Sequence, residues 1–197
     1  MEKFYLERPN INRKKEAIEY INEFIQNNSE IHGVGSLHKY LENYESWLNH
    51  LQEMRNIKEI GKLVPAETFF LIRENDNKIV GMIDIRLALN DFLKKYGGNI
   101  GYSIRPTERR KGYNKINLYL ALKFCKEKGL NKVLLDCDYN NLGSARTIIS
   151  LGGKLVKEEI NEISNTVMKD FEIDVEDSIN EYSALYDSKI SDKNLFL

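Results

Sequence analysis

Apolar residues recur at helical spacing in the first third of the chain. Between Asn12 and Asn27 they return every three or four residues, which is typical of a helix with one buried face. These positions are Ala17, Ile18, Ile21, Phe24 and Ile25. After a loop with two glycines, Ser36 is a good N-cap residue for a second helix that continues through Trp47 to Leu51. The pattern predicts a helical N-terminal part over about residues 10–55.

The period changes from helix to strand after Pro65. Residues 67–87 contain two β-rich runs separated by Asn75-Asp76-Asn77, which predicts a hairpin. A short helical turn is expected at residues 91–96 and a third strand at 99–104, where Pro106 stops it. The middle of the chain is therefore expected to begin as antiparallel sheet.

The second half alternates helices with strands. A long helix is predicted from Tyr113 to Lys128, with Gly129 as its C-terminal cap. Residues 133–137 (VLLDC) form an almost continuous apolar run, typical of a central strand covered on both faces. A helix at about 142–151 precedes two further runs, 154–160 and 166–175, which predict a closing hairpin. Residues 1–175 are thus expected to form one domain with a sheet core at about 66–175. The pattern predicts no structure for the extension 176–197.

Composition narrows the class of protein. The chain has 197 residues, of which 42% are hydrophobic and 30% charged, enough for one sizeable core. Its formal net charge of -1 argues against binding a polyanion, since nucleic-acid binders usually carry a basic excess. The N-terminus lacks a signal-like apolar core, and no segment approaches the ~18 apolar residues of a membrane span. We therefore expect a soluble cytoplasmic protein.

Cysteines and histidines give no sign of a metal or a disulfide framework. Cys125 and Cys137 are too few for such a framework and lie in apolar segments, which predicts two small core residues in a reducing compartment. His32, His38 and His50 show no ligand spacing to one another or to the cysteines. No metal is expected.

The segment from Arg105 to Asn114 is a basic turn at the start of the long helix. The first amides of a helix lack intrahelical acceptors and carry the positive end of its dipole, so a phosphate there accepts several hydrogen bonds. Gly112 permits close approach of a ligand, while Arg109, Arg110 and Lys111 add positive charge. The plainer interpretation is that the glycine only turns the chain and the cations are solvated. The Walker lysine motif and the three-glycine dinucleotide fingerprint are both absent from the sequence.

Two motifs give the chain a resemblance to a known family. Residues 104–114 (IRPTERRKGYN) resemble the pyrophosphate loop of the GNAT superfamily of N-acetyltransferases. There an Arg or Gln, two residues, a Gly, one residue and a Gly or Ala precede a helix. Asn141-Leu-Gly-Ser144, followed by Leu151-Gly152, is similar to a later element of that superfamily. The element order agrees over roughly residues 67–175, and NIGYSIRPTERRKGY resembles a bacterial branch of predicted acetyltransferases.

The resemblance implies a fold and a reaction. The implied fold is α+β, with N-terminal helices and a mixed central sheet whose central strand pair splays apart. The implied reaction is direct attack of a primary amine of a small molecule or peptide on the thioester of acetyl-CoA, which serves as acyl donor with no metal. Homodimers are common among such proteins.

The resemblance also assigns cofactor-binding residues. Backbone groups near Ile104 would pair with pantetheine and polarise the thioester carbonyl. Asn141 would hydrogen-bond the pantetheine arm, and Ser144 would line the same channel. The pyrophosphate would bind to the backbone amides of Arg109, Arg110, Lys111, Gly112, Tyr113 and Asn114.

Three positions depart from the family pattern. Asn114 stands where Gly or Ala is usual and adds bulk beside the phosphates. Ile148 stands where many members carry a Tyr that protonates the departing CoA thiolate, and Gly153 replaces a common Phe. These departures keep open a second hypothesis, a catalytically impaired acyl-CoA-binding module. A third, nucleic-acid binding through residues 105–111, lacks aromatic residues interleaved with the basic patch.

The general base is not identified by the motifs. An amine with a pKa near ~10 must lose a proton before it attacks, which usually takes a carboxylate or a water chain. The candidates are Asp84 and Glu67 in the hairpin strands and Tyr102 in the third strand. Asp84 alternates with Ile83 and Ile85, so its position is compatible with the substrate cleft or with solvent. Because most strand carboxylates are solvated, a surface role is the favoured prediction. The loop 31–35 would shape the acceptor pocket in the family's architecture.

Overall fold

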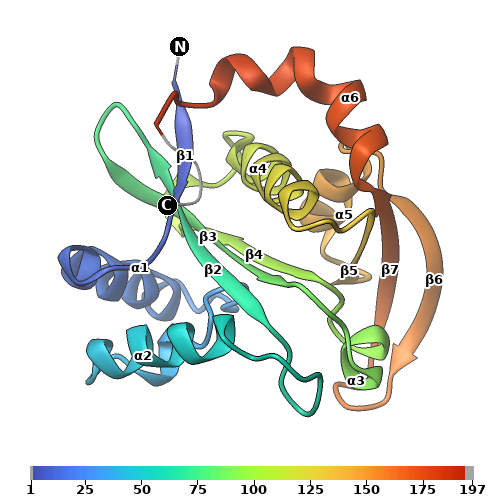
Figure 1. Ribbon diagram of the computed structural model, residues 1–197, viewed down its shortest axis with the longest axis horizontal. Helices are drawn as coiled ribbons and strands as arrows, with labels where there is room; N and C mark the ends of the chain where they lie inside the picture. The colour runs from blue at the N-terminus through green and yellow to red at the C-terminus, as the bar shows by residue number, and fades with distance from the viewer. Residues whose placement is uncertain (1, 194–197) are drawn as a thin grey trace.

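Two antiparallel sheets form the centre of the computed structural model, which describes residues 2–193 (Figure 1). The first sheet has the order β1-β2-β3-β4 and the second the order β5-β7-β6. The strands are β1 (Phe4–Glu7), β2 (Ala66–Arg73), β3 (Lys78–Arg86), β4 (Ile100–Ile104), β5 (Lys132–Asp138), β6 (Lys154–Asn161) and β7 (Thr166–Asp174). Both predicted hairpins are confirmed, β2 with β3 and β6 with β7.

Helices cover both faces of the first sheet. Figure 1 shows α1 (Lys14–Gln26) and α2 (Tyr44–Arg55) on one side and α4 (Tyr113–Glu127) on the other. Strand alternation explains the arrangement, because Phe69 and Leu71 of β2 face the α4 core while Phe70 and Ile72 face the α1–α2 core. A sheet buried on both faces accounts for the nearly unbroken apolar run of β2.

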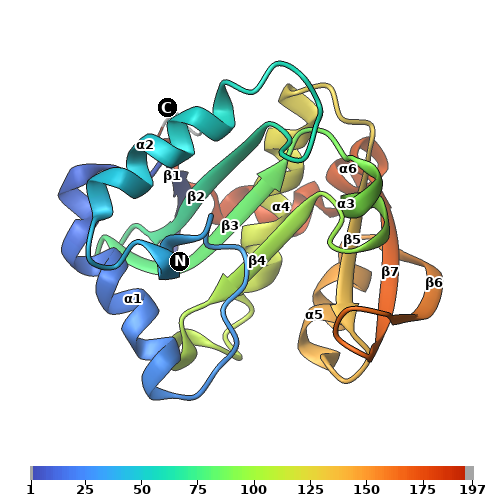
Figure 2. The ribbon, with the colours of Figure 1, turned by 90° about the horizontal axis from the view of Figure 1, so that it is seen from below.

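The splayed strand pair implied by the family resemblance is present. At one end β4 and β5 lie in contact, where the Asn99 amide donates to the Leu134 carbonyl at 2.6 Å and the Asn99 Oδ1 accepts from the Leu134 amide at 2.9 Å. Beyond this clamp the two strands belong to different sheets and diverge (Figure 2). The α+β class and the splayed centre are therefore confirmed.

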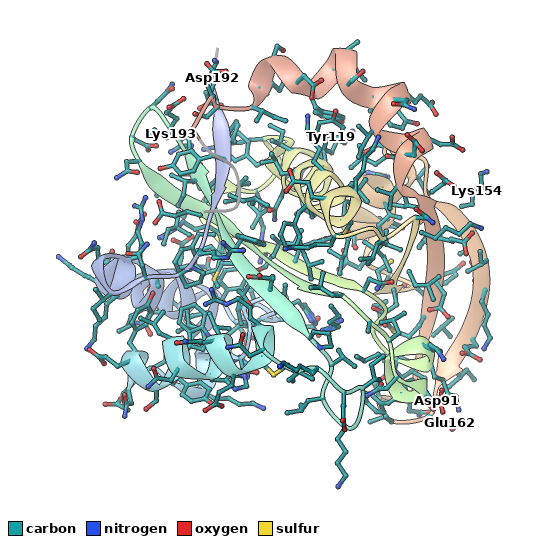
Figure 3. The ribbon with its side chains drawn as sticks, in the orientation of Figure 1. Asp91, Tyr119, Lys154, Glu162, Asp192 and Lys193 are labelled. Atoms are coloured by element: carbon teal, nitrogen blue, oxygen red, sulfur yellow. The ribbon has the colours of Figure 1, made fainter. Side chains whose placement is uncertain are left out.

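The C-terminal segment is a helix that packs on α4. Helix α5 (Leu142–Ile149) lies on the second sheet, and α6 (Val175–Tyr186) runs over α4. Tyr119, labelled beneath α6 in Figure 3, donates its hydroxyl to Asp187 at 2.9 Å. Ser191 then donates its amide to the Phe4 carbonyl at 2.8 Å. The part of the predicted extension at 194–197 lies outside the described residues.

The turn between β6 and β7 contacts the segment that connects β3 to β4 in the first sheet. Helix α3 (Asp91–Lys95) confirms the predicted helical turn. Lys95 and the Tyr96 hydroxyl contact the Glu162 carboxylate at 3.0 and 3.1 Å, and Glu162 lies next to α3 in Figure 3. Among the described residues, no helix is long and apolar enough to cross a membrane.

Three details of the sequence prediction are wrong. The N-terminal third also contains β1, which pairs with β2 at the edge of the sheet. Ser36 is left-handed and begins only a short 3-10 turn, whereas Asn43 caps α2 by accepting from the Ser46 amide. Strand β5 is not covered equally on both faces, because Leu134 and Asp136 are half-buried while their neighbours are buried.

Candidate active site

A cavity of about 610 Å³ opens where β4 and α5 face each other. The end of α1 with its following loop and the segment before α4 complete its walls. It brings together nearly all of the cofactor-binding residues expected from the sequence. The predicted residues that line it are Tyr102, Ile104, Arg109, Arg110, Gly112, Tyr113, Asn114, Asn141 and Ser144.

The backbone at the start of α4 presents five consecutive amides without acceptors. Within the described residues, none of the amides of residues 110–114 donates a hydrogen bond. Arg110 and Gly112 both have positive φ, at 64° and 81°, and a turn of this kind curves successive N–H groups toward one point. A Cβ built on Gly112 would meet nothing within 4 Å. The turn therefore fits a phosphate group, as the sequence predicts.

The three cations of this turn have different surroundings. Arg109 donates to the Ile104 carbonyl at 3.2 Å and to Ser29 at 2.7 Å, so its guanidinium is already committed to the protein. Lys111 bonds Glu108 at 2.7 Å and does not line the cavity. Arg110 lines the cavity with no hydrogen bond or ion pair to any described residue. Of the three, Arg110 is the cation available to a ligand.

Glu108 holds the phosphate turn in place. Its buried carboxylate contacts Arg73 at 2.8 Å, Lys78 at 3.0 Å and Lys111 at 2.7 Å. Burial alone would raise the pKa of Glu108, but hydrogen bonds from Arg73, Lys111 and Lys78 outweigh it and lower the pKa to about 2. The carboxylate is thus neutralised by its own partners and does not oppose an anion nearby.

Helix α1 supports the same turn from the other side. One carboxylate oxygen of Glu23 accepts from the Thr107 amide at 2.7 Å, and the other pairs with Arg105 at 3.1 Å. Both contacts fix the chain between β4 and α4 before any ligand binds.

Asn114 leaves room beside the turn. Its side chain is half-buried at the cavity, and its Oδ1 is a buried acceptor with no partner among the described residues. An orphaned polar atom of this kind is costly unless a ligand or water satisfies it. The bulk of Asn114 does not fill the space over Gly112, since a Cβ built there meets no atom of Asn114 within 4 Å.

The opposite wall is the beginning of α5. Asn141 caps the helix, since its Oδ1 accepts from the Ser144 amide at 3.0 Å. Ser144 in turn bonds the Tyr102 hydroxyl at 2.8 Å across the gap between the sheets. Burial raises the pKa of Tyr102, although the Ser144 bond lowers it in part, so the phenol keeps its proton.

Ile148 and Gly153 are in direct contact. Ile148 is fully buried, and a Cβ built on Gly153 would lie 2.3 Å from its Cγ2 atom. The two residues that depart from the family pattern therefore pack against each other. Position 148 supplies no hydroxyl to the cavity.

Glu67 is buried and Asp84 is half-buried, with its side chain 15% exposed, so the favoured prediction of a solvated surface role is wrong for both. Glu67 accepts from Arg8 at 3.1 Å and lies 3.7 Å from Arg55. Asp84 accepts from Thr68 at 2.7 Å, and burial raises its pKa. Neither carboxylate lines the cavity. Strand pairing brings Thr68 opposite Asp84, which the sequence pattern does not reveal.

Sequence reasoning missed Asp136. It alternates with Leu135 and Cys137, so it points to the face of β5 away from α5, two residues beyond the clamp. No other described residue forms a hydrogen bond or ion pair with its carboxylate; the charges of Arg86 and His32 act on it, and burial raises its pKa. The polar residues within VLLDCD were the available signal. The described residues contain no group of three or more His, Cys, Asp or Glu that could hold a metal.

Comparisons with known proteins agree with this geometry. The model of the acetyltransferase (GNAT) family matches residues 20–152. No curated protein sequence matches the chain significantly. Solved structures do: RimJ of Mycobacterium smegmatis, in complex with CoA-disulfide, has a TM-score of 0.70 and 13% identity, covering 92% of this chain and 88% of that one.

Two further structures show the same fold. Mutant forms of the spermidine/spermine N-acetyltransferase SpeG of Vibrio cholerae have a TM-score of 0.63 and 12% identity, covering 91% of this chain and 98% of that one. The ribosomal-protein-S5-alanine acetyltransferase of Vibrio fischeri has a TM-score of 0.63 and 16% identity, covering 89% and 94%. At these identities the structures establish the fold alone. With a family model matched over more than half of its length, the chain belongs to the acetyltransferase (GNAT) family.

Proposed function

We propose that this protein transfers an acetyl group from acetyl-CoA to a primary amine of a small molecule or peptide. The observation that carries the proposal is that one cavity contains both an anion site and space for an extended ligand next to it. Five free amides at the start of α4 supply an anion site, and the same cavity continues between β4 and α5.

Different residues around the cavity bind different parts of acetyl-CoA. The amides of residues 110–114 and the Arg110 guanidinium hold the pyrophosphate. Backbone groups of β4 near Ile104 face the pantetheine arm, with Ser144 on the other wall. Asn141 uses its Oδ1 for capping, so its Nδ2 is the group left to donate.

The amine approaches from the opposite face of the strand pair. On that face the loop after α1 packs so closely on β4 that a Cβ on Gly33 would lie 2.3 Å from the Gly101 carbonyl oxygen. The loop carries Glu30 and His32, which pair at 3.1 Å and line the cavity. Asp136 lies two residues beyond the clamp and, like Glu67 and Asp84, does not line this cavity; it lines a second cavity of about 240 Å³ between α3 and the second sheet. From there it takes, through water, the proton that the amine must lose.

The acceptor is expected to be an amine that is attracted by carboxylates near the site. Glu30 and Asp136 both favour a substrate that arrives as an ammonium ion. Polyamines and peptide α-amines both meet this description, and the similar structures include an enzyme named for each. We also infer a cytoplasmic setting, supported by the two buried free thiols of Cys125 and Cys137.

A thiol-release assay tests the function. Purified protein is incubated with acetyl-CoA and, separately, spermidine, lysine amide and an alanyl peptide with a free α-amine. We expect CoA release that depends on at least one amine and a product heavier by one acetyl group in mass spectrometry. Acetyl-CoA binding without turnover on any amine would instead support the acyl-CoA-binding module.

A further inference from the structure

A tyrosine lies across the cavity from the helix position at which the family's usual proton donor is missing. The family resemblance places that donor at position 148, where this chain has a buried isoleucine packed against Gly153. Two tyrosines line the cavity, Tyr102 and Tyr113. The Tyr113 hydroxyl is engaged by Glu2 at 2.9 Å and by Arg73 at 3.1 Å, outside the strand gap.

The hydroxyl of Tyr102 reaches the helix from the other side of the gap. Alternation along β4 directs Tyr102 to the same face as Ile100 and Ile104, toward α4 and α5. Its hydroxyl lies 2.8 Å from the Ser144 Oγ. Ser144 precedes Ile148 by four residues, so both lie along one side of α5. A hydroxyl from β4 thus stands one helical turn from the usual donor position.

We propose that Tyr102 is the proton donor to the departing CoA sulfur, presented from β4 in place of a tyrosine on α5. The assignment rests on the proposed function and names a group for a step that the family motifs leave without one in this chain. Ser144 is a positioning residue, because its Oγ fixes the direction of the phenol across the cavity.

The proposed step is an acyl transfer that releases CoA as the free thiol. The amine nitrogen bonds the acetyl carbonyl carbon, the carbon–sulfur bond breaks, and its electron pair stays on sulfur. Tyr102 gives its hydroxyl proton to that sulfur, forming the CoA thiol. The proton lost by the amine passes to Asp136 and from there to solvent, and water returns one proton to the phenolate oxygen. No oxidant or reductant is needed.

The surroundings of Tyr102 keep the phenol protonated until the sulfur needs the proton. Burial raises the pKa of Tyr102, and the nearby Cys137 and Asp136 act in the same direction. Ser144 is the one hydrogen-bonding partner of the hydroxyl among the described residues, through its Oγ at 2.8 Å and its carbonyl oxygen at 3.5 Å. A hydroxyl that served only to brace β4 against α5 would change stability or affinity on removal and leave the chemical step intact.

Tyr102→Phe tests the assignment, with Tyr139→Phe as a matched control. Tyr139 directly follows β5, is exposed and does not line the cavity. With spermidine and an alanyl peptide as acceptors, we expect Y102F to lower kcat about 10- to 100-fold. General acid catalysis typically contributes about 10²- to 10⁴-fold, and a moderately good leaving group such as the CoA thiolate depends on it less. The Kd for acetyl-CoA and the thermal midpoint should stay near wild-type values, and Y139F should retain kcat within twofold.

Ser144→Ala separates positioning from bracing. We expect S144A to lower kcat less than Y102F does, and the double variant to be no slower than Y102F, because Ser144 acts through the phenol. A Y102F kcat within twofold of wild type overturns the assignment, as does an unchanged kcat with weakened acetyl-CoA binding. A wild type that binds acetyl-CoA and acetylates none of the amines overturns the proposed function itself, and the assignment with it.

Discussion

Arg73 and Glu108 form a two-point ion pair that joins the end of β2 to the turn ahead of α4. The Arg73 Nη1 and Nη2 atoms lie 2.8 and 3.2 Å from the two carboxylate oxygens. Lys78 and Lys111 complete the neutralisation of Glu108. The turn is therefore held by the protein's own charges, and its free amides need no rearrangement to receive a phosphate.

Replacing Glu108 by Gln should cost stability at neutral pH and little at strongly acidic pH. The folded pKa of about 2 lies below the ordinary 4.5, so the ionised form favours the folded state. This contribution, on the order of 3 kcal/mol, is complete above pH 4.5 and is lost as the pH falls toward about 2. Urea unfolding of wild type and E108Q between pH 7 and pH 2.5 measures it. Glu53→Gln, an exposed change in α2, is the control, and a wild-type advantage independent of pH would contradict the account.

The contact between Ile148 and Gly153 predicts a coupled pair of substitutions. Gly153→Ala should destabilise the fold by about 1–3 kcal/mol, because the added methyl group collides with a buried side chain. Ile148→Ala removes the Cγ2 methyl that the added group would meet, so the double variant should lose less than the sum of the singles. Strict additivity in chemical denaturation would show that the two positions are not coupled.

Asp136→Asn tests the proton acceptor on the amine side. We expect kcat/KM to fall by about 100-fold near pH 7, and the deficit to shrink toward pH 10 as more amine arrives deprotonated. Asp170→Asn is the matched control, since Asp170 pairs directly opposite on β7, farther from β4. A wild-type pH profile for D136N would rule out the role.

The same substitution makes a prediction for stability. Burial raises the pKa of Asp136 above its ordinary value, so the ionised carboxylate costs folding free energy at neutral pH. D136N should therefore unfold at the same temperature as wild type or at a higher one. A group that lowers stability and lacks a partner in the described residues is typical of a functional site.

Local sequence was sufficient for the elements with strong local patterns. The strands β2 and β3 and helix α4 were predictable because each is an apolar-rich segment bounded by turn residues, Asn75-Asp76-Asn77 for the hairpin and Gly112 and Gly129 for the helix. Strand β1 was not, since a four-residue edge strand carries too little pattern and depends on its pairing with β2. Asn43 and not Ser36 caps α2, because the chain after Ser36 forms a 3-10 turn and the helix begins only at Tyr44.

The cofactor side of the site was more predictable than the chemical centre. The phosphate turn is a contiguous motif, so its residues could be named from the sequence. Asp136 faces a different element from its sequence neighbours, and the Tyr102–Ser144 bond joins residues 42 positions apart. Such relationships depend on where the two sheets diverge, which local pattern does not specify.

Calorimetric titration with acetyl-CoA, comparing wild type with Arg110→Ala, tests the central claim most directly. Arg110 is the cation of the turn without a partner among the described residues, and alanine at this position removes its charge alone. We predict saturable binding at one site per chain, weakened roughly tenfold in R110A, as expected for loss of one charge-assisted contact. Lys126→Ala, at the far end of α4, should bind like wild type. No binding by the wild type, or equal affinity in R110A, would contradict the assignment of this turn as the acetyl-CoA site.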